Sequence, residues 1–199
     1  MKRTISLLLA LMMLLSLTAC GEDGLSFKPG GDTSKDELIY PNDDGYALGY
    51  VGDTLRTSFF DMTVKDPYTC AEYDGLTPDE GYKFLVADIT IYNHTNSTQP
   101  MYDTDFEVMW DQDDDDAWAW PECDETQGAD GETLYSTRSD KQIPVEFDLG
   151  IHKTEEGVLL YQVPEDSKDY FIAYYEVFEA SQEGGDPEYG DSFYVRFSA

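Results

Sequence analysis

Short segments in which large apolar residues alternate with polar ones recur from about residue 47 to the end of the chain. A period of two residues is the pattern of a β-strand that buries one face. It is clearest in residues 106–110, 143–149 and 193–197. The segment Tyr82–Tyr92 is apolar on both faces over its first half, a pattern expected of a central strand.

Three further strands are expected, at residues 54–64, 158–163 and 170–178. Turn-forming residues separate the strands, notably at positions 93–96, 128–131 and 184–187. Beyond the first twenty residues, no stretch shows the apolar period of a helix. The pattern therefore predicts an all-β domain over residues 47–199, an antiparallel β-sandwich of about seven to nine strands.

The first twenty residues have the features of an export signal. Lys2 and Arg3 precede an apolar run that is too short to span a bilayer, which needs about 20 residues. The run ends in Leu17-Thr18-Ala19-Cys20, which resembles the bacterial lipobox, whose cysteine receives a diacylglyceryl group and becomes the new N-terminus. We therefore expect a signal peptide at 1–19 and a lipid anchor on Cys20. The alternative is an ordinary signal peptide.

These features predict a protein anchored on the extracellular face of the cell membrane, or in the periplasm or outer membrane of a bacterium with two membranes. Residues 20–46 are acidic and rich in glycine, with few large apolar residues. Such a composition cannot bury enough surface to offset the entropy lost on ordering. We expect a flexible tether between the anchor and the domain.

The charge of the chain limits its partners. Its 42 acidic and 12 basic residues give a formal charge of −30. Nucleic acid is excluded as a partner, because binding a phosphate backbone requires a basic surface. The same charge is repelled by anionic lipid headgroups, so membrane association depends on the anchor, and it favours cationic partners.

Several motifs resemble those of a known family. They are Gly52-Asp53-Thr54-Leu55, Met62-Thr63-Val64, the segment from Gly81 to Asn93, Phe106-Glu107-Val108, and residues 157–164 with their closing Val163-Pro164. Together they resemble the immunoglobulin-like domain of secreted and lipid-anchored bacterial proteins, related to an immunoprotective mycobacterial antigen. The resemblance implies an immunoglobulin-like sandwich over about residues 48–199 and brings no active site. The acidic segment 111–140 departs from the family pattern.

Two candidate sites involve cysteine and aspartate. In an exported protein, Cys70 and Cys123 are expected to form a disulfide, and two free thiols are the alternative. The alternating carboxylates of Asp111, Asp113 and Asp115 have a spacing that suits Ca²⁺. Because the glycine and glutamate of a complete EF-hand loop are missing, we favour a solvated hairpin tip, with weak calcium binding as the alternative. No other cofactor is expected.

The aromatic residues suggest a second kind of site. Trp110, Trp118 and Trp120 lie near one another in the sequence and could form a platform for a sugar or a peptide. Tryptophans at alternating strand positions are, however, more often part of a core.

Catalysis has little support in the sequence. The only histidines, His94 and His152, lie in expected turns, and no common catalytic motif is present. We therefore predict a protein that is not an enzyme. Its expected function is to bind an envelope or extracellular protein or glycan, with cationic partners favoured. A calcium or small-ligand carrier is the alternative, and an envelope enzyme is third.

Overall fold

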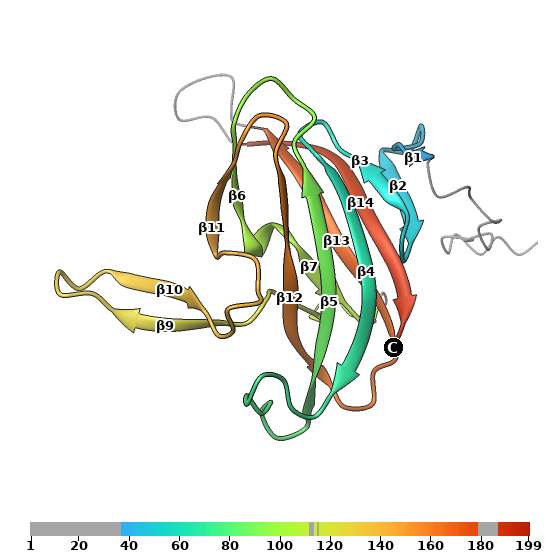
Figure 1. The fold of residues 1–199 in the computed structure, drawn as a ribbon. Helices are drawn as coiled ribbons and strands as arrows, with labels where there is room; N and C mark the ends of the chain where they lie inside the picture. Colours follow the sequence, from blue (N-terminus) through green and yellow to red (C-terminus); the bar gives the residue numbers. More distant parts are fainter. Residues whose placement is uncertain (1–36, 112–113, 115, 179–186) are drawn as a thin grey trace, which may run out of the picture. The chain divides into compact units, whose positions relative to one another are not determined.

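The computed structural model describes residues 37–111, 114, 116–178 and 187–199, and these form four β-sheets (Figure 1). The predicted signal peptide, Cys20 and residues 20–36 of the tether lie outside the described residues. Two sheets have five strands each, and two have two strands each. Among the described residues there is no α-helix, and the only helical element is the short 3₁₀ helix η1 (Asp103–Asp105). The predicted all-β sandwich is therefore confirmed.

The first large sheet has the strand order β1-β3-β4-β5-β12. The second has the order β2-β14-β13-β7-β8, and the small sheets pair β6 with β11 and β9 with β10. The bounds of the strands are β1 Leu38–Ile39, β2 Tyr46–Tyr50, β3 Thr54–Arg56, β4 Asp61–Cys70, β5 Tyr82–Tyr92, β6 Gln99–Tyr102, β7 Glu107–Met109, β8 Trp118–Ala119, β9 Cys123–Gln127, β10 Thr133–Thr137, β11 Glu146–Leu149, β12 Thr154–Pro164, β13 Asp169–Phe178 and β14 Glu188–Ser198.

The central strand predicted from the sequence has the expected bounds and position. β5 covers Tyr82–Tyr92 and is hydrogen-bonded to β4 on one side and to β12 on the other. Its two apolar faces contact two different clusters. Leu85, Ala87 and Ile89 face the main core, while Phe84 and Val86 pack on the outer side of the sheet with Leu160. Burial on both faces explains why this segment lacks a polar face.

The N-terminal strands differ from the prediction in direction and extent. β1 pairs with β3 and β2 pairs with β14, and both pairs are parallel, so the sandwich is not wholly antiparallel. Fourteen strands are present in the described part of the chain, more than the seven to nine expected. β1 and the first residue of β2 also fall within the segment assigned to the tether. These two strands cover the edges of β3 and β14, which would otherwise expose unpaired backbone groups.

The segment 54–64 folds into two strands rather than the single strand expected. A tight turn joins β3 to β4, and in it the backbone N–H of Thr57 donates to the carbonyl of Phe60. The Thr57 hydroxyl accepts the N–H groups of Phe59 and Phe60 in return. A threonine that caps its own turn reverses the chain without glycine or proline, which explains why the turn escaped the sequence pattern.

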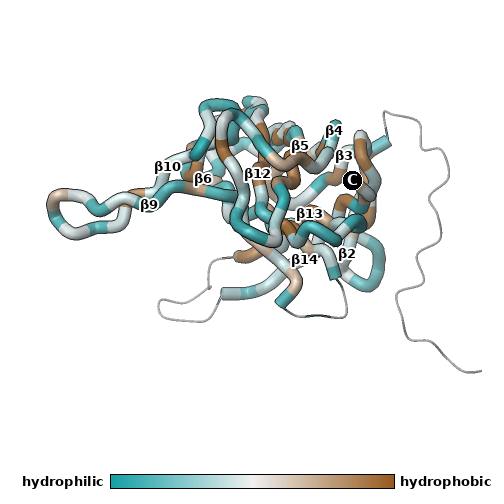
Figure 2. Tube along the Cα trace, turned by 90° about the horizontal axis from the view of Figure 1, so that it is seen from below, coloured by the Kyte–Doolittle hydropathy of each residue, from teal (hydrophilic) through white to brown (hydrophobic). Residues whose placement is uncertain are grey.

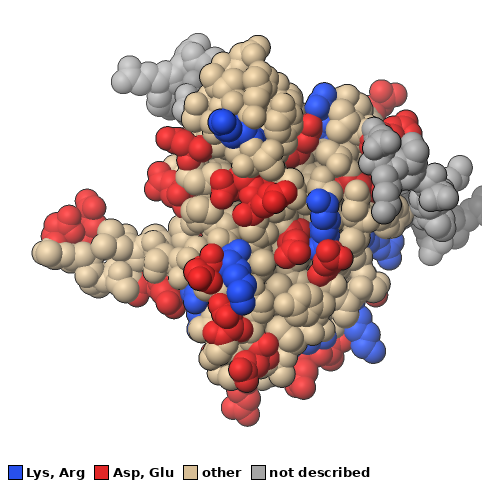
Figure 3. Space-filling view, in the orientation of Figure 1, with Lys and Arg blue, Asp and Glu red and all other residues tan. Residues whose placement is uncertain are grey.

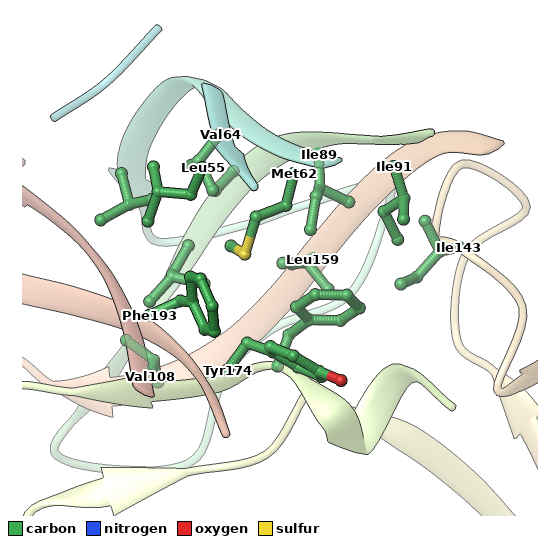
Figure 4. Close-up of a cluster of buried hydrophobic side chains, with 14 of the residues drawn as sticks. Leu55, Met62, Val64, Ile89, Ile91, Val108, Ile143, Leu159, Tyr174 and Phe193 are labelled. Atoms are coloured by element: carbon green, nitrogen blue, oxygen red, sulfur yellow. The ribbon is translucent and has the colours of Figure 1, made fainter. Parts of the chain in front are cut away.

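The main core lies between the two large sheets (Figure 4). One side is formed by Leu55, Met62, Val64, Ile89 and Leu159, and the other by Val108, Tyr174 and Phe193. Hydrophobic segments gather between the sheets in the tube view, whereas the β9–β10 hairpin is largely hydrophilic (Figure 2). In the described part of the chain, no helix has the length and apolar character needed to cross a membrane.

Candidate functional site

The β9–β10 hairpin extends away from the two large sheets (Figure 1). β9 and β10 pair in antiparallel register, with Cys123 opposite Thr137 and Glu125 opposite Tyr135. The glycine turn predicted at residues 128–131 is confirmed, because the N–H of Gly131 donates to the carbonyl of Gly128. The two strands themselves were not predicted, since most of their side chains are solvent-exposed and carry no apolar alternation.

The base of this hairpin is fixed to the rest of the domain by buried polar contacts. The backbone N–H of Glu122 donates to the carbonyl of Leu160 in β12 at 2.7 Å. The amide group of Gln142, which is 8% exposed, donates to the Glu122 carbonyl and accepts the N–H groups of Arg138 and Ser139. The guanidinium of Arg138 forms an ion pair with Glu122 at 2.6 Å. These contacts hold the base in place while the tip stays in solvent.

A groove of about 810 Å³ lies between the hairpin, the end of β6, η1 and the segment that leads into β11. All five residues of β10 line it, so the groove runs along this strand. Several aromatic and apolar side chains on its walls are exposed, at 44% for Tyr102, 51% for Trp120, 52% for Leu134 and 54% for Tyr135. Pro121 and Pro144 add rigid apolar surface. Exposed aromatic side chains around a groove are typical of binding surfaces.

Asp103 also lines this groove and is the most unusual residue in it. The residue is only 2% exposed, and neither of its carboxylate oxygens accepts a hydrogen bond from any described residue. Its backbone is held in place, because its N–H donates to the carbonyl of Val145 and its carbonyl accepts the N–H of Phe106. A buried polar group without a partner is rare in proteins and requires an explanation.

Burial raises the pKa of Asp103 from 3.8 to about 6. The N–H groups of Thr104 and of Asp103 itself lower this pKa, although neither donates a hydrogen bond of good geometry to the carboxylate, and the charge of Asp105 raises it. Asp103 acts in turn on its neighbours. The pKa of the Cys123 thiol is raised by burial and then by Asp103, and the same two causes raise the pKa of Tyr161. At neutral pH the buried carboxylate is therefore largely ionised.

The groove carries negative charge only. Asp103, Glu125 and Glu146 line it, and no lysine or arginine is among its described lining residues. Acidic side chains also outnumber basic ones over the face of the molecule shown in Figure 3. Arg138, at the base of the hairpin, forms ion pairs with Glu122 and Asp124. The groove therefore suits a cationic or neutral ligand.

The three tryptophans named from the sequence do not form one platform. Trp110 is partly buried and packs against the main core. Trp118 and Trp120 are both exposed and form an edge-to-face pair, with ring centroids 5.0 Å apart. Only Trp120 lines the groove.

The predicted Cys70–Cys123 disulfide is absent, and both thiols are free. Cys70 at the end of β4 lies opposite Phe84 in β5, which lies opposite Gln162 in β12. The segment that contains Cys123 lies beyond β12, so the two residues are about three strand spacings, roughly 14 Å, apart. A disulfide requires its Cα atoms to be within about 7 Å.

The other candidate residues that the structure describes, Asp111, His94 and His152, are not among those that line this groove. Of the three aspartates suggested for calcium, Asp113 and Asp115 lie outside the described residues. No cluster of three metal-binding side chains occurs in the described part of the chain. His94 lies 3.0 Å from the Thr57 carbonyl through its Nε2 atom, and the ring of His152 stacks on Tyr92.

Sequence reasoning missed Asp103, Tyr102 and Tyr135. Asp103 is one of 42 acidic residues, and nothing in its immediate sequence distinguishes it from the others. The pair Leu134-Tyr135 could have indicated the site, because two large apolar residues in an acidic, glycine-containing segment suggest an exposed binding surface.

Comparison with known proteins identifies no family. No family model matches the chain, and no curated protein does. The similar solved structures include ycdA of Bacillus subtilis strain 168, described as a candidate lipoprotein, at 12% identity and a TM-score of 0.48, with 73% of this chain and 38% of that chain covered. This chain thus spans less than half the length of that protein.

Two other solved structures are similar at this level. The yjhA protein of Bacillus subtilis is 16% identical, with 63% of this chain and 79% of that chain covered and a TM-score of 0.40. An uncharacterised β-sandwich protein of Clostridium difficile 630 is 9% identical, with 85% and 99% covered and a TM-score of 0.39. These similarities are too distant to carry over a site or a function, and membership of the mycobacterial antigen family is not shown.

Proposed function

We propose that this protein is a lipid-anchored binding module of the bacterial cell envelope, which holds an extended segment of a partner protein in the groove beside β10. The observation that carries the proposal is the groove itself, with four exposed aromatic and apolar side chains on its walls. A tethered domain with such a surface is suited to capturing partners outside the cell.

The open edge of β10 favours a polypeptide over a glycan. In the described part of the chain, β10 pairs only with β9. Its consecutive residues from Thr133 to Thr137 all line the groove, so the strand borders the groove along its edge and not merely with one face. An extended peptide can add to such an edge through backbone hydrogen bonds, with its side chains in contact with Tyr135 and Trp120.

Binding rather than catalysis fits the groups that line the groove. Neither histidine is among the lining residues, and the one lining cysteine, Cys123, has a raised pKa. A thiol with a raised pKa is a poor nucleophile at neutral pH. Among the described residues, the carboxylate of Asp103 has no hydrogen-bond partner that could serve as a second catalytic group.

The anchor is tested by replacing the lipidated residue. In Cys20→Ala we expect the diacylglyceryl group to be absent and the leader to remain uncut before residue 20, because both steps require the thiol of this cysteine. The measurement is membrane fractionation with mass spectrometry of the N-terminus. Cys70→Ala, which removes a thiol from the folded domain, is the matched control and should still be lipidated and cut. A natural protein whose Cys20 carries no lipid, or a Cys20→Ala variant that is still cut before residue 20, would exclude the anchor.

The groove is tested by selecting peptides from a random displayed library against the purified full chain. Peptides that bind this groove should lose about 5-fold or more in affinity in Trp120→Ala and in Tyr135→Ala, because truncating a central aromatic side chain typically costs more than 1 kcal/mol. The affinities are measured by calorimetry.

Tyr189→Ala is the matched control for this experiment. Tyr189 is 78% exposed and does not line the groove, so its removal should leave the affinity unchanged. Selected peptides that bind equally well to Trp120→Ala, Tyr135→Ala and the control would show that the groove is not the binding site.

A further inference from the structure

We infer that the partner segment places a cationic side chain, lysine or arginine, above the carboxylate of Asp103, which is its counter-ion at the floor of the groove. This inference rests on the proposed binding function and specifies the charge of the side chain that the groove recognises. The carboxylate is buried and without a hydrogen-bond partner among the described residues. A buried carboxylate is stable only when it is protonated or paired, and the structure supplies no pairing group.

No basic residue of the described domain is positioned to be that partner. Arg138 forms ion pairs with Glu122 and Asp124, and Lys141 forms one with Asp74. The side chains of Glu125 and Glu146, which also line the groove, add negative potential at its mouth. The groove therefore attracts a cation from outside the domain, and Asp103 is its least hydrated carboxylate.

The walls of the groove fit the rest of such a side chain. Lysine and arginine have apolar stems that bury against aromatic and proline surfaces while the charged end stays with its partner. Tyr102, Trp120 and Tyr135 provide aromatic rings that also attract a cation directly, and Pro121 and Pro144 provide apolar surface. An anionic or purely apolar side chain would leave the carboxylate unpaired.

The cation reaches Asp103 through a local rearrangement. The carboxylate oxygens have almost no exposed surface in this structure, so a neighbouring side chain must turn aside. We expect this side chain to be Tyr102, which precedes Asp103, lines the groove and is 44% exposed. Such a change involves side chains on the groove wall and leaves the backbone contacts of Asp103 with Val145 and Phe106 in place.

The preference for a cation should disappear in acid. The pKa of Asp103 is raised to about 6, so below that pH the residue becomes a neutral acid and no longer attracts a positive charge. Other titratable groups around it come from η1, β9, β11 and β12, namely Asp105, Cys123, Glu125, Glu146 and Tyr161. Burial raises the pKa values of Asp105, Cys123 and Tyr161, and comparison with Asp103→Asn shows how much of the pH dependence belongs to Asp103.

Two capped heptapeptides that differ at one position test the inference. Both alternate threonine and valine, which favours the extended form, and one carries a central lysine where the other carries norleucine. Binding to the full chain is followed at pH 7.5 and pH 4.5 by the NMR shifts of the Trp120 indole N–H and the β10 amides. We expect the lysine peptide to bind about 10-fold more tightly at pH 7.5 and both peptides to bind about equally at pH 4.5.

Variants then assign the effect to one carboxylate. In Asp103→Asn the preference for lysine should fall to about 2-fold or less, whereas Glu125→Gln, which neutralises an exposed acid of the same groove, should keep most of it. Unchanged amide dispersion in both variants shows that they fold. A preference that survives in Asp103→Asn would overturn the inference.

The remaining outcomes separate this inference from the proposed function. If both peptides shift the groove resonances equally at pH 7.5, the groove binds peptides without a preference for a cationic side chain, so only the inference fails. If neither peptide shifts them, the inference also fails, and the library selection decides independently whether the groove is a binding site.

Discussion

Replacing Asp103 with asparagine is expected to raise the free energy of unfolding by about 2 kcal/mol at pH 7.5. Folding raises the pKa of this carboxyl from 3.8 to about 6, which corresponds to about 3 kcal/mol of destabilisation when the group is ionised. Asparagine carries no charge, but its buried amide also lacks a partner, which costs about 1 kcal/mol. The variant should therefore be more stable than the natural protein.

The effect has a defined dependence on pH. Because the pKa of Asp103 is higher in the folded state, the contribution of this residue to the free energy of unfolding is most favourable below about pH 4. That stability is lost as the pH rises from 3.8 to about 6. The advantage of Asp103→Asn should thus be absent at pH 4, grow between pH 4 and 6, and stay constant above. Urea unfolding at pH 4, 5, 6 and 7.5 measures it.

Asp148→Asn is the control for this prediction. It neutralises an exposed carboxylate on β11 and should change the free energy of unfolding by less than about 0.5 kcal/mol. An Asp103→Asn variant that is less stable than the natural protein at pH 7.5 would contradict the account of this residue. A destabilising buried charge that the fold retains is typical of a binding site, where stability and function compete.

Replacing Gly157 with alanine is expected to lower the free energy of unfolding by about 3 kcal/mol. A Cβ atom at this position of β12 would lie 2.7 Å from Cγ2 and 2.8 Å from the backbone nitrogen of Ile143. Ile143 is 1% exposed, so it has no space into which to move. Overpacking of this kind costs about 1 to 3 kcal/mol, and it would also strain the hydrogen bond from the Ile143 N–H to the Val158 carbonyl.

This substitution should also disturb the groove, because Ile143 immediately precedes Pro144 and Val145, which line it. Thermal and urea unfolding measure the loss of stability, and the Trp120 resonance reports on the groove. Gly150→Ala is the matched control, since its Cβ would meet only the flexible side chain of Lys153. An alanine at 157 that is tolerated as well as one at 150 would show that the contact with Ile143 is not tight.

The strands that bury an apolar face could be predicted from the sequence. The apolar run of β5 and the alternation of Phe193, Val195 and Phe197 in β14 both correspond to residues that the structure buries. Their side chains must leave water wherever their partners are in the sequence, so each strand can be recognised by itself. The fold class followed from several such segments without helical periodicity.

The hairpin and the parallel edge pairs could not be predicted in this way. β9 and β10 expose most of their side chains, so no alternation marks them as strands. The parallel pairing of β2 with β14 joins segments that are far apart in the chain, and the short β2 strand has no property that selects its partner. The two cysteines show the same limit. Their presence in an exported chain predicts a disulfide, but in the folded domain β5 and β12 separate them.

The sequence by itself determined the class of the fold, the positions of its buried strands and the acidic composition of the chain, and it predicts an export signal and a lipid anchor. These properties depend on residue type and local spacing, which any single segment displays. Only the tertiary structure decided that Tyr102, Trp120 and Tyr135 share a groove and that Asp103 is buried beneath it without a partner. Whether a side chain is buried and whether it has a hydrogen-bond partner depend on the neighbours that folding brings to it. Neither property can be read from the residue type alone.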